Sequence, residues 1–281
     1  MKPPPFSYVA PTSLDEAVEA LAEHGEDAKV LAGGQSLIPL LSLRLARPTA
    51  LIDLNGVTEL ASIEVNGSTT IGAMTRHRAV ERSADIARHQ PLVAAAVPYI
   101  GHSAIRTRGT VGGSLAHADP AAELPAVALA LDATFEARST RATRVIHAAD
   151  FFVGYFTTAL EPDEVLTRVT FPNAAPNTGV SVQEMARRHG DFAMVAAIAS
   201  VTIGGNTRIA LINVADRPVR AHEAEVAMQS GAPIDEVADL ATRDLDPTAD
   251  LHASAAYRRS VARVLVRRAL TEATERAKDA P

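Results

Sequence analysis

The amino-acid sequence predicts an α+β protein, on the evidence of three features. Residues 29–54 show the pattern strand, turn, helix and strand, with a Gly-Gly pair at the turn. Beyond residue 179, three strand-like runs are followed by three helix-like segments, an order typical of a separate α+β layer. Residues 173–179 (Asn-Ala-Ala-Pro-Asn-Thr-Gly) separate the two parts and have the composition of a linker. We therefore expect a mixed first part and a C-terminal domain made of a three-stranded antiparallel sheet with helices.

Local signals predict the individual elements in order. Ser13 and Glu16 form a capping box, and the helix that they start ends near Gly25. Asn66-Gly67 predicts the turn of a hairpin. Strands are predicted over residues 29–32, 50–54, 61–65, 69–73, 133–138, 144–147, 165–171, 180–187, 193–203 and 208–214. Helices are predicted over residues 13–25, 37–45, 76–88, 91–99, 123–131, 219–229, 234–242 and 255–278, and residues 101–119 are expected to be irregular.

The composition excludes several classes of function. The chain has 281 residues with 47% hydrophobic side chains, enough for a sizeable core and about two domains by length. A net charge of −6 argues against binding to nucleic acid. The absence of cysteine excludes disulfides, thiolate zinc sites and iron–sulfur clusters held by this chain. No apolar run is long enough to span a membrane and no signal peptide precedes the first helix, so we expect a cytoplasmic protein.

Two similar segments could bind a phosphate group. The first glycine segment is residues 32–36 (Ala-Gly-Gly-Gln-Ser), and the second is residues 110–114 (Thr-Val-Gly-Gly-Ser). Glycine lets a ligand approach the backbone closely, and successive amides can then form a nest for phosphate oxygens. A single Gly-Gly-x-Ser is usually an ordinary turn, and neither segment matches a Rossmann or Walker motif. The pair of segments by itself indicates a diphosphate-bearing ligand.

Other polar residues are open to two interpretations. Asp119 could accept hydrogen bonds from ribityl or ribose hydroxyls, or could cap the helix that follows Pro120. His117 is interpreted as a structural histidine, because no partner ligands at metal spacing accompany it. Residues 187–193 (Arg-Arg-His-Gly-Asp-Phe-Ala) fit a polar turn between two strands.

The ordered set of motifs resembles the FAD-binding medium subunit of the molybdenum hydroxylases. This family includes carbon monoxide dehydrogenases, xanthine dehydrogenases and dehydrogenases of N-heterocycles and alkaloids. The resemblance covers essentially the whole chain. Its main motifs are Leu-Ala-Gly-Gly-Gln-Ser-Leu (31–37), Ile-Gly-Ala-Met-Thr (71–75), Ile-Arg-Thr-Arg-Gly-Thr-Val-Gly-Gly-Ser-Leu-Ala-His-Ala-Asp-Pro (105–120), Phe-Phe-Val-Gly-Tyr-Phe-Thr-Thr-Ala-Leu (151–160) and Arg-His-Gly-Asp-Phe-Ala (188–193).

The resemblance implies two FAD-binding subdomains of the vanillyl-alcohol-oxidase (PCMH) type, residues 1–58 and 59–175, followed by a C-terminal α+β domain, residues 176–281. The two glycine segments would surround the FAD diphosphate, Asp119 would bind the ribityl or ribose part, and Phe192 would lie near the isoalloxazine. The full set of implied FAD-binding residues is Lys29, Leu31, Ala32, Gly33, Gly34, Gln35, Ser36, Leu37, Thr75, Gly109, Thr110, Val111, Gly112, Gly113, Ser114, Leu115, Ala118, Asp119, Leu166, Asp191 and Phe192. No residue of this chain is expected to act as a catalytic group or a metal ligand.

The resemblance also implies partners. A small subunit would carry two-iron two-sulfur clusters and a large subunit would carry the molybdenum pterin cofactor, in a dimer of heterotrimers. Electrons would pass from the clusters through noncovalently bound FAD to an external acceptor. The alternatives are a stand-alone FAD-dependent oxidase or dehydrogenase and a non-catalytic nucleotide-binding protein.

Two positions depart from the family pattern. Gln35 stands where carbon monoxide dehydrogenases typically have His, and Glu184 stands where many relatives have Lys. The first departure weakens an assignment to carbon monoxide, and the second puts a flavin contact from position 184 in doubt. The sequence of residues 114–120 (Ser-Leu-Ala-His-Ala-Asp-Pro) is closer to that of the heterocycle and alkaloid branch of the family.

Overall fold

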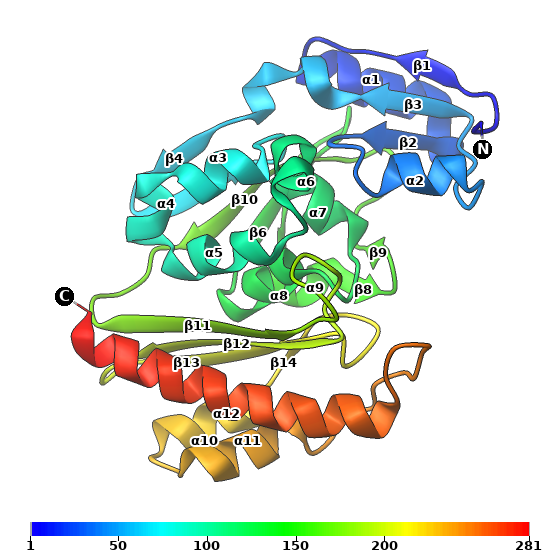
Figure 1. Cartoon of the computed structure of the whole chain (residues 1–281). Coiled ribbons are helices and arrows are strands. Elements are labelled where there is room, and N and C mark those ends of the chain that lie inside the picture. The colour runs from blue at the N-terminus through cyan, green and yellow to red at the C-terminus, as the bar shows by residue number, and fades with distance from the viewer. Residues whose placement is uncertain (1, 281) are drawn as a thin grey trace.

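A small parallel sheet begins the molecule, in a computed structural model that describes residues 2–280. Its strand order is β1-β3-β2, and the segment between β2 and β3 contains the first glycine segment and α2 (Figure 1). Ser13 Oγ caps α1 by accepting from Glu16 N at 3.2 Å, as predicted, while Glu16 itself accepts from Thr12 N at 2.7 Å. The elements are β1 (Ser7–Val9), α1 (Leu14–His24), η1 (Gly25–Asp27), β2 (Ala28–Leu31), α2 (Leu37–Ser42), β3 (Ala50–Asp53), η2 (Leu54–Gly56) and η3 (Thr58–Leu60).

A five-stranded antiparallel sheet forms the middle of the molecule, with the order β4-β5-β10-β6-β7. The hairpin predicted around Asn66-Gly67 is present, with Gly67 at a φ of +74°. Helices α3 to α8 follow β5, and β10 returns late in the sequence to the centre of the sheet. The elements are β4 (Ile63–Val65), β5 (Ser68–Gly72), α3 (His77–Arg82), α4 (Ala84–His89), α5 (Pro91–Ala96), η4 (Val97–Tyr99), α6 (Ser103–Arg108), α7 (Val111–His117), α8 (Glu123–Ala130), β6 (Thr134–Arg138), β7 (Thr143–His147), α9 (Ala148–Phe151), β8 (Phe152–Gly154), β9 (Thr157–Thr158) and β10 (Val165–Pro172).

The C-terminal part is an antiparallel sheet covered by helices on one face. The long helix α12 lies across the sheet, with α10 and α11 beside it (Figure 1). Three long strands are present as predicted, and a two-residue strand, β14, adds a fourth at the edge in the order β11-β12-β13-β14. The elements are β11 (Thr178–Met185), β12 (Val195–Thr202), β13 (Thr207–Ile212), β14 (Val219–Arg220), α10 (His222–Gln229), α11 (Ile234–Thr242) and α12 (Ala255–Asp279).

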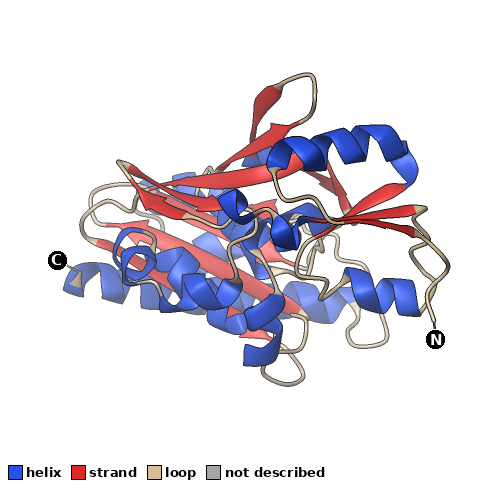
Figure 2. Cartoon of the chain, turned by 90° about the horizontal axis from the view of Figure 1, so that it is seen from above, coloured by secondary structure: helices blue, strands red, loops and turns tan. Residues whose placement is uncertain are grey.

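Alternating side chains of the C-terminal sheet enter two different cores. In β12, Ala196 and Ile198 pack with the middle part of the molecule, whereas Val195 and Ala197 pack under α12. Successive side chains of a strand point to opposite faces, so one strand supplies both cores. The view from above shows the sheets and helices stacked in layers (Figure 2). The C-terminal sheet is therefore buried on both faces and is joined to the middle part by a continuous core.

Two predicted segments differ clearly from the structure. Residues 219 and 220, predicted as the start of a helix, form the edge strand β14, and helix α10 begins only at His222. Residues 101–119 were expected to be irregular but contain two short helices, α6 and α7. The glycines at positions 112 and 113 lie inside the first turn of α7, where their low helix propensity concealed the helix. The second glycine segment is therefore a helix start, as the first one is.

Candidate functional site

The first glycine segment connects the end of β2 to the start of α2. Gly34 has a φ of +73°, in the left-handed region that favours glycine. Gly33 is buried, and a Cβ at this position would lie 2.4 Å from the carbonyl oxygen of Arg108. Gln35 Nε2 donates to Gly33 O at 2.9 Å and stabilises the turn. The backbone of this segment therefore packs directly against the residues that precede the second glycine segment.

The second glycine segment forms the cap and first turn of α7. Thr110 Oγ1 accepts from Gly113 N at 3.1 Å. A Cβ on Gly113 would lie 3.3 Å from the Cβ of Ala32, and one on Gly112 would lie 2.4 Å from the Cβ of Ala73. These glycines are needed for close approach between segments. The fold thus brings together the two glycine segments that are 78 positions apart in the sequence when counted from Ala32 to Thr110.

The other predicted residues support or surround the two segments. Lys29 and Leu31 lie in β2, Leu37 begins α2, and Leu166 is buried in β10. Thr75 supports the second segment through its backbone, because Thr75 O accepts from Val111 N at 3.0 Å. Its hydroxyl donates to Ser62 O at 2.9 Å.

The residues after α7 make a tight turn. Ala118 is left-handed, with a φ of 50°, at the C-terminal cap of α7. Asp119 Oδ1 accepts from Ala121 N at 2.9 Å, so its carboxylate serves as a turn-forming group before α8. The predicted pair Asp191 and Phe192 lies in the turn between β11 and β12, where Phe192 is 68% exposed. That turn packs against the start of α6, since a Cβ on Gly190 would lie 2.6 Å from the His102 ring.

Two acidic residues outside the predicted set are the main addition from the structure. Glu123, at the start of α8, is buried with 6% exposure. Burial, reinforced by the charges of Glu184 and Asp119, raises the pKa of Glu123 to about 8. Burial also raises the pKa of Glu184, on β11, to about 7. In the sequence Glu123 resembled an ordinary first-turn acid of a helix, so no signal distinguished it.

These carboxyl groups and the glycine segments fit a bound FAD. Glu184 Oε2 is buried without a hydrogen-bond partner among the described residues. Buried polar atoms in folded proteins almost always have a partner, so an orphaned oxygen indicates a place for a polar ligand group. The glycine segments supply backbone that a ligand can approach closely, and the chain has no cysteine to which a flavin could be attached.

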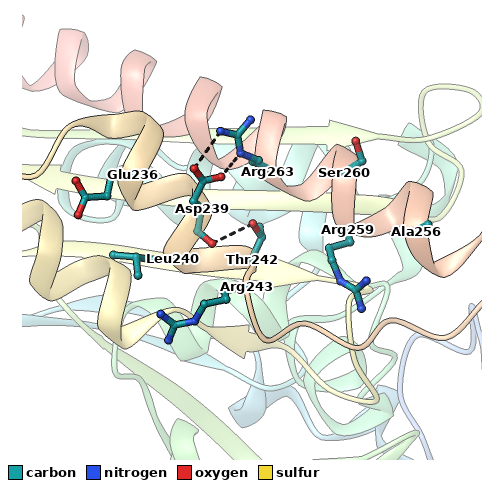
Figure 3. A pocket seen from close by; sticks show the side chains of 9 residues that line it. All are labelled: Glu236, Asp239, Leu240, Thr242, Arg243, Ala256, Arg259, Ser260 and Arg263. Atoms are coloured by element: carbon teal, nitrogen blue, oxygen red, sulfur yellow. Dashed lines mark hydrogen bonds and ion pairs between the residues drawn. The ribbon is translucent and has the colours of Figure 1, made fainter.

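A cavity of about 560 Å³ lies elsewhere, between α11 and α12 (Figure 3). Its arginines already have protein partners: Arg263 pairs with Asp239, and Arg259 donates to Leu245 O at 2.8 Å. Its lining includes none of the predicted site residues. We therefore assign the candidate site to the glycine segments.

Within residues 2–280, the acidic and histidine side chains form no group of three that could hold a metal ion. Across the same residues, no helix combines the length and apolar character that crossing a membrane requires.

Comparison with known proteins agrees with the predicted family. Residues 4–174 match the family model of the FAD binding domain in molybdopterin dehydrogenase. Residues 180–273 match the carbon monoxide dehydrogenase flavoprotein C-terminal domain. The 6-hydroxypseudooxynicotine dehydrogenase complex subunit alpha of Paenarthrobacter nicotinovorans is 41% identical, over 99% of this chain and 97% of its own. The caffeine dehydrogenase subunit beta of Pseudomonas sp. strain CBB1 is 38% identical, over 98% and 97%.

Solved structures show the same fold over the full length. A carbon monoxide dehydrogenase structure from Hydrogenophaga pseudoflava superposes with a TM-score of 0.95 at 38% identity, covering 98% of this chain and 99% of the matched chain. Quinoline 2-oxidoreductase from Pseudomonas putida 86 gives a TM-score of 0.92 at 38% identity, covering 99% of both chains. The chain therefore belongs to the family of FAD-binding medium subunits of the molybdenum hydroxylases.

Proposed function

We propose that this chain is the electron-transfer subunit of a molybdenum-dependent hydroxylase complex. It would hold FAD noncovalently between iron–sulfur clusters of a small partner subunit and an external electron acceptor. Bound flavin can accept electrons one at a time and release two, so it suits a position between one-electron and two-electron carriers. The role of the protein is to bind the cofactor, orient it and shield it from water.

The contact between the two glycine segments carries this proposal. Gly33 lies against Arg108 O, and Gly113 lies against Ala32, so backbone from two subdomains meets at one place. A diphosphate needs several amide donors within a few ångströms. The amides of residues 111–114 already donate within the protein, so we propose that the first segment supplies the amide donors and that the second lets the ligand approach its backbone closely. We propose the residues predicted from the family resemblance as the FAD contacts.

The organisation into domains belongs to the same proposal. We propose FAD-binding subdomains at residues 1–58 and 59–175 and a C-terminal domain at residues 176–281. Each of these segments contains one of the larger sheets. The molybdenum pterin cofactor would reside in a large partner subunit, and two heterotrimers would form the complete assembly.

The first experiment asks whether the purified full-length chain binds flavin. We expect a flavin absorption spectrum, release of FAD on denaturation, and no oxidation of organic substrates until partner subunits are added. Gly33→Ala should weaken FAD binding, because its Cβ would meet the Arg108 carbonyl. Gly154→Ala is the matched control, since its Cβ makes only an ordinary contact at 3.4 Å. A colourless chain that cannot be reconstituted with FAD would refute the proposal.

We propose a nitrogen heterocycle as the substrate class of the complex. Gln35 and the sequence of residues 114–120 favour that branch, and relatives named for 6-hydroxypseudooxynicotine, caffeine and nicotine are 38–41% identical. The assembled complex should reduce an artificial acceptor with nicotine-type bases or purines. Reduction with carbon monoxide alone would contradict this assignment.

A further inference from the structure

One side-chain pair touches the backbone on both sides of the contact between glycine segments. Asn55, in η2 directly after β3, donates from Nδ2 to Ala32 O at 3.0 Å. Arg76 donates from Nη2 to Asn55 Oδ1 at 2.6 Å and from Nη1 to Arg108 O. Ala32 begins the first glycine segment, and Arg108 precedes the second by two residues. The Asn55–Arg76 pair is therefore a direct polar link between the two segments.

The link is held in place from the side of the N-terminal sheet. Asp53 Oδ1 accepts from Asn55 N at 2.9 Å, and Tyr8 OH donates to Asp53 Oδ2 at 2.5 Å. Burial alone would raise the pKa of Asp53, but hydrogen bonds from Tyr8 and Asn55 and the charge of Arg108 outweigh it and lower the pKa. Asp53 thus stays ionised at neutral pH and orients Asn55 toward the glycine segments.

The backbone holds the link from the other side. Residues 76 and 110 form an antiparallel bridge, with His77 N donating to Gly109 O at 3.0 Å. Arg108 O, which Arg76 contacts, is also the atom that a Cβ on Gly33 would meet. Arg76 thus binds at the point where the two subdomains touch.

The charge around the link favours an anion. Arg76 and Arg108 are close enough that Arg108 lowers the pKa of Arg76, after the larger effect of burial. The charge of Asp53 raises the pKa of Arg76. The Asp53 carboxylate therefore lies close to the guanidinium groups of both Arg76 and Arg108. The cluster of Arg76, Arg108 and Asp53 leaves one positive charge beside the glycine segments, where it can attract a diphosphate.

We propose that Asn55 and Arg76 are positioning residues that set the spacing of the two glycine segments for the FAD diphosphate. This inference rests on the proposed placement of FAD at those segments. Holding both segments in the bound arrangement before the ligand arrives reduces the ordering cost of binding. Loss of the link would let the segments separate and would weaken diphosphate binding without unfolding the chain, because each sheet retains its own core.

The test is a set of titrations with the full-length apoprotein. FAD is the cofactor probe, ADP is the smallest diphosphate probe, and FMN is the flavin probe that lacks a diphosphate. Asn55→Ala and Arg76→Gln should each weaken FAD and ADP binding by about 10- to 100-fold, the range for a lost charge-assisted hydrogen bond. FMN affinity should change by less than about threefold on the same scale. The melting temperature should fall by less than about 4 °C.

Two further variants separate positioning from general stability. The double variant should bind FAD no more weakly than the poorer single variant, because both substitutions break one link. Arg141→Gln, which removes an exposed ion pair with Asp163, is the matched control and should bind like the wild type. Equal affinity of Asn55→Ala, Arg76→Gln and wild type for FAD and ADP would overturn the inference while leaving the proposed function intact. Parallel losses of FMN affinity and melting temperature would overturn it in favour of a purely structural role. A wild-type chain that binds no FAD would instead refute the proposed function on which the inference rests.

Discussion

His77 is a buried imidazole at the start of α3, beside Gly109, and neither ring nitrogen meets the geometric criteria for a hydrogen bond within residues 2–280. Burial, with the charges of Arg106 and Arg76, lowers its pKa from 6.5 to about 4. In the unfolded chain the His77 imidazole therefore takes up a proton near pH 6.5, whereas in the folded chain it does so only near pH 4. Stability is lost as the pH falls through this window, by about 3 kcal/mol at most.

We expect His77→Leu to remove this acid sensitivity. The free energy of unfolding, measured by urea denaturation, should fall less steeply between pH 6.5 and 4 in the variant than in the wild type. The exposed residue His147 provides the control, and His147→Leu should follow the wild-type curve. Identical pH profiles for His77→Leu and wild type would show that this imidazole does not remain neutral in the folded chain.

Glu123 has the opposite linkage. The pKa of Glu123 is raised from 4.5 to about 8 in the folded protein. Its contribution to the stability of the fold is therefore fully present below pH 4.5 and is lost as the pH rises toward 8. Glu123→Gln keeps the shape and cannot ionise. In the apoprotein we expect the variant to gain stability over the wild type progressively from pH 4.5 to 8, by a few kcal/mol at the upper end.

Thermal unfolding of the apoprotein at several pH values measures this difference. Glu19→Gln, on the exposed face of α1, should show no such pH-dependent gain. A variant that is less stable than wild type at pH 8 would mean that the Glu123 carboxylate has a favourable partner.

The residue types in the sequence predicted the places where two backbone segments approach closely. They did not predict which charged side chains are buried. The two Gly-Gly pairs can be recognised directly in the sequence, and in the structure a Cβ at these positions would crowd neighbouring atoms. Glu123 and Glu184 were not predicted as a pair because their proximity depends on how α8 packs against the C-terminal sheet. Asp119 could be interpreted as a helix cap or as a ligand group. Its carboxylate accepts from Ala121 N in the turn before α8, whose N-cap is Ala122, so it is not the cap and its role as a ligand group stays a prediction.

Gly179 lets α12 lie directly on β11. A Cβ at this position would lie 2.0 Å from Ala273 O and 2.3 Å from Ala277 N, both in the backbone of α12. We expect Gly179→Ala to force the helix away from the sheet and to destabilise the chain by about 2–3 kcal/mol. The corresponding fall in melting temperature is roughly 4–12 °C.

Gly154→Ala serves as the control in the same thermal scans, because its Cβ meets only Asp216 Oδ2 at 3.4 Å. A Gly179→Ala variant as stable as the wild type would show that α12 can shift outward at little cost. The effect should appear in stability with FAD binding retained, since α12 belongs to the C-terminal part.

Elements with a strong local signal were predicted well, and elements that depend on tertiary contacts were not. The capped helix α1 and the long helix α12 follow from their apolar spacing and caps. Helices α6 and α7 have only six and seven residues, and α7 has two glycines in its first turn, so packing rather than propensity stabilises them. The two-residue strand β14 is too short to have any period.

At the scale of the whole molecule, the order of the segments was predictable but their meeting point was not. Apolar periodicity and the linker at residues 173–179 indicated a mixed first part and an α+β C-terminal part. No local pattern shows that β10 inserts between β5 and β6, or that the C-terminal sheet shares a core with the middle part. The resemblance to a family predicted which residues form the site. The contacts in the structure explain why glycine is needed at the two segments.

A ligand that joins two subdomains should stabilise the weaker one most. The N-terminal sheet has its own small core, to which residues 59–175 contribute Leu60, Met74 and Val165. We therefore expect removal of FAD to loosen the N-terminal sheet before the rest of the chain. Free FAD at 1,000 times its Kd should add about 4 kcal/mol of stability and raise the melting temperature by roughly 8–16 °C.

Hydrogen exchange with and without FAD measures where this stability is gained. Amides of β1, β2 and β3 should gain protection on adding FAD. Amides of α12 should change little, because the core under α12 contains no residue of the glycine segments. Uniform protection across the chain would indicate that all three sheets unfold as one unit. Protection confined to the C-terminal sheet would contradict cofactor binding at the glycine segments, because Gly33 follows β2 of the N-terminal sheet and Gly113 lies in α7, both outside the C-terminal sheet. Figure 1 shows α2 and α7 at a distance from α12.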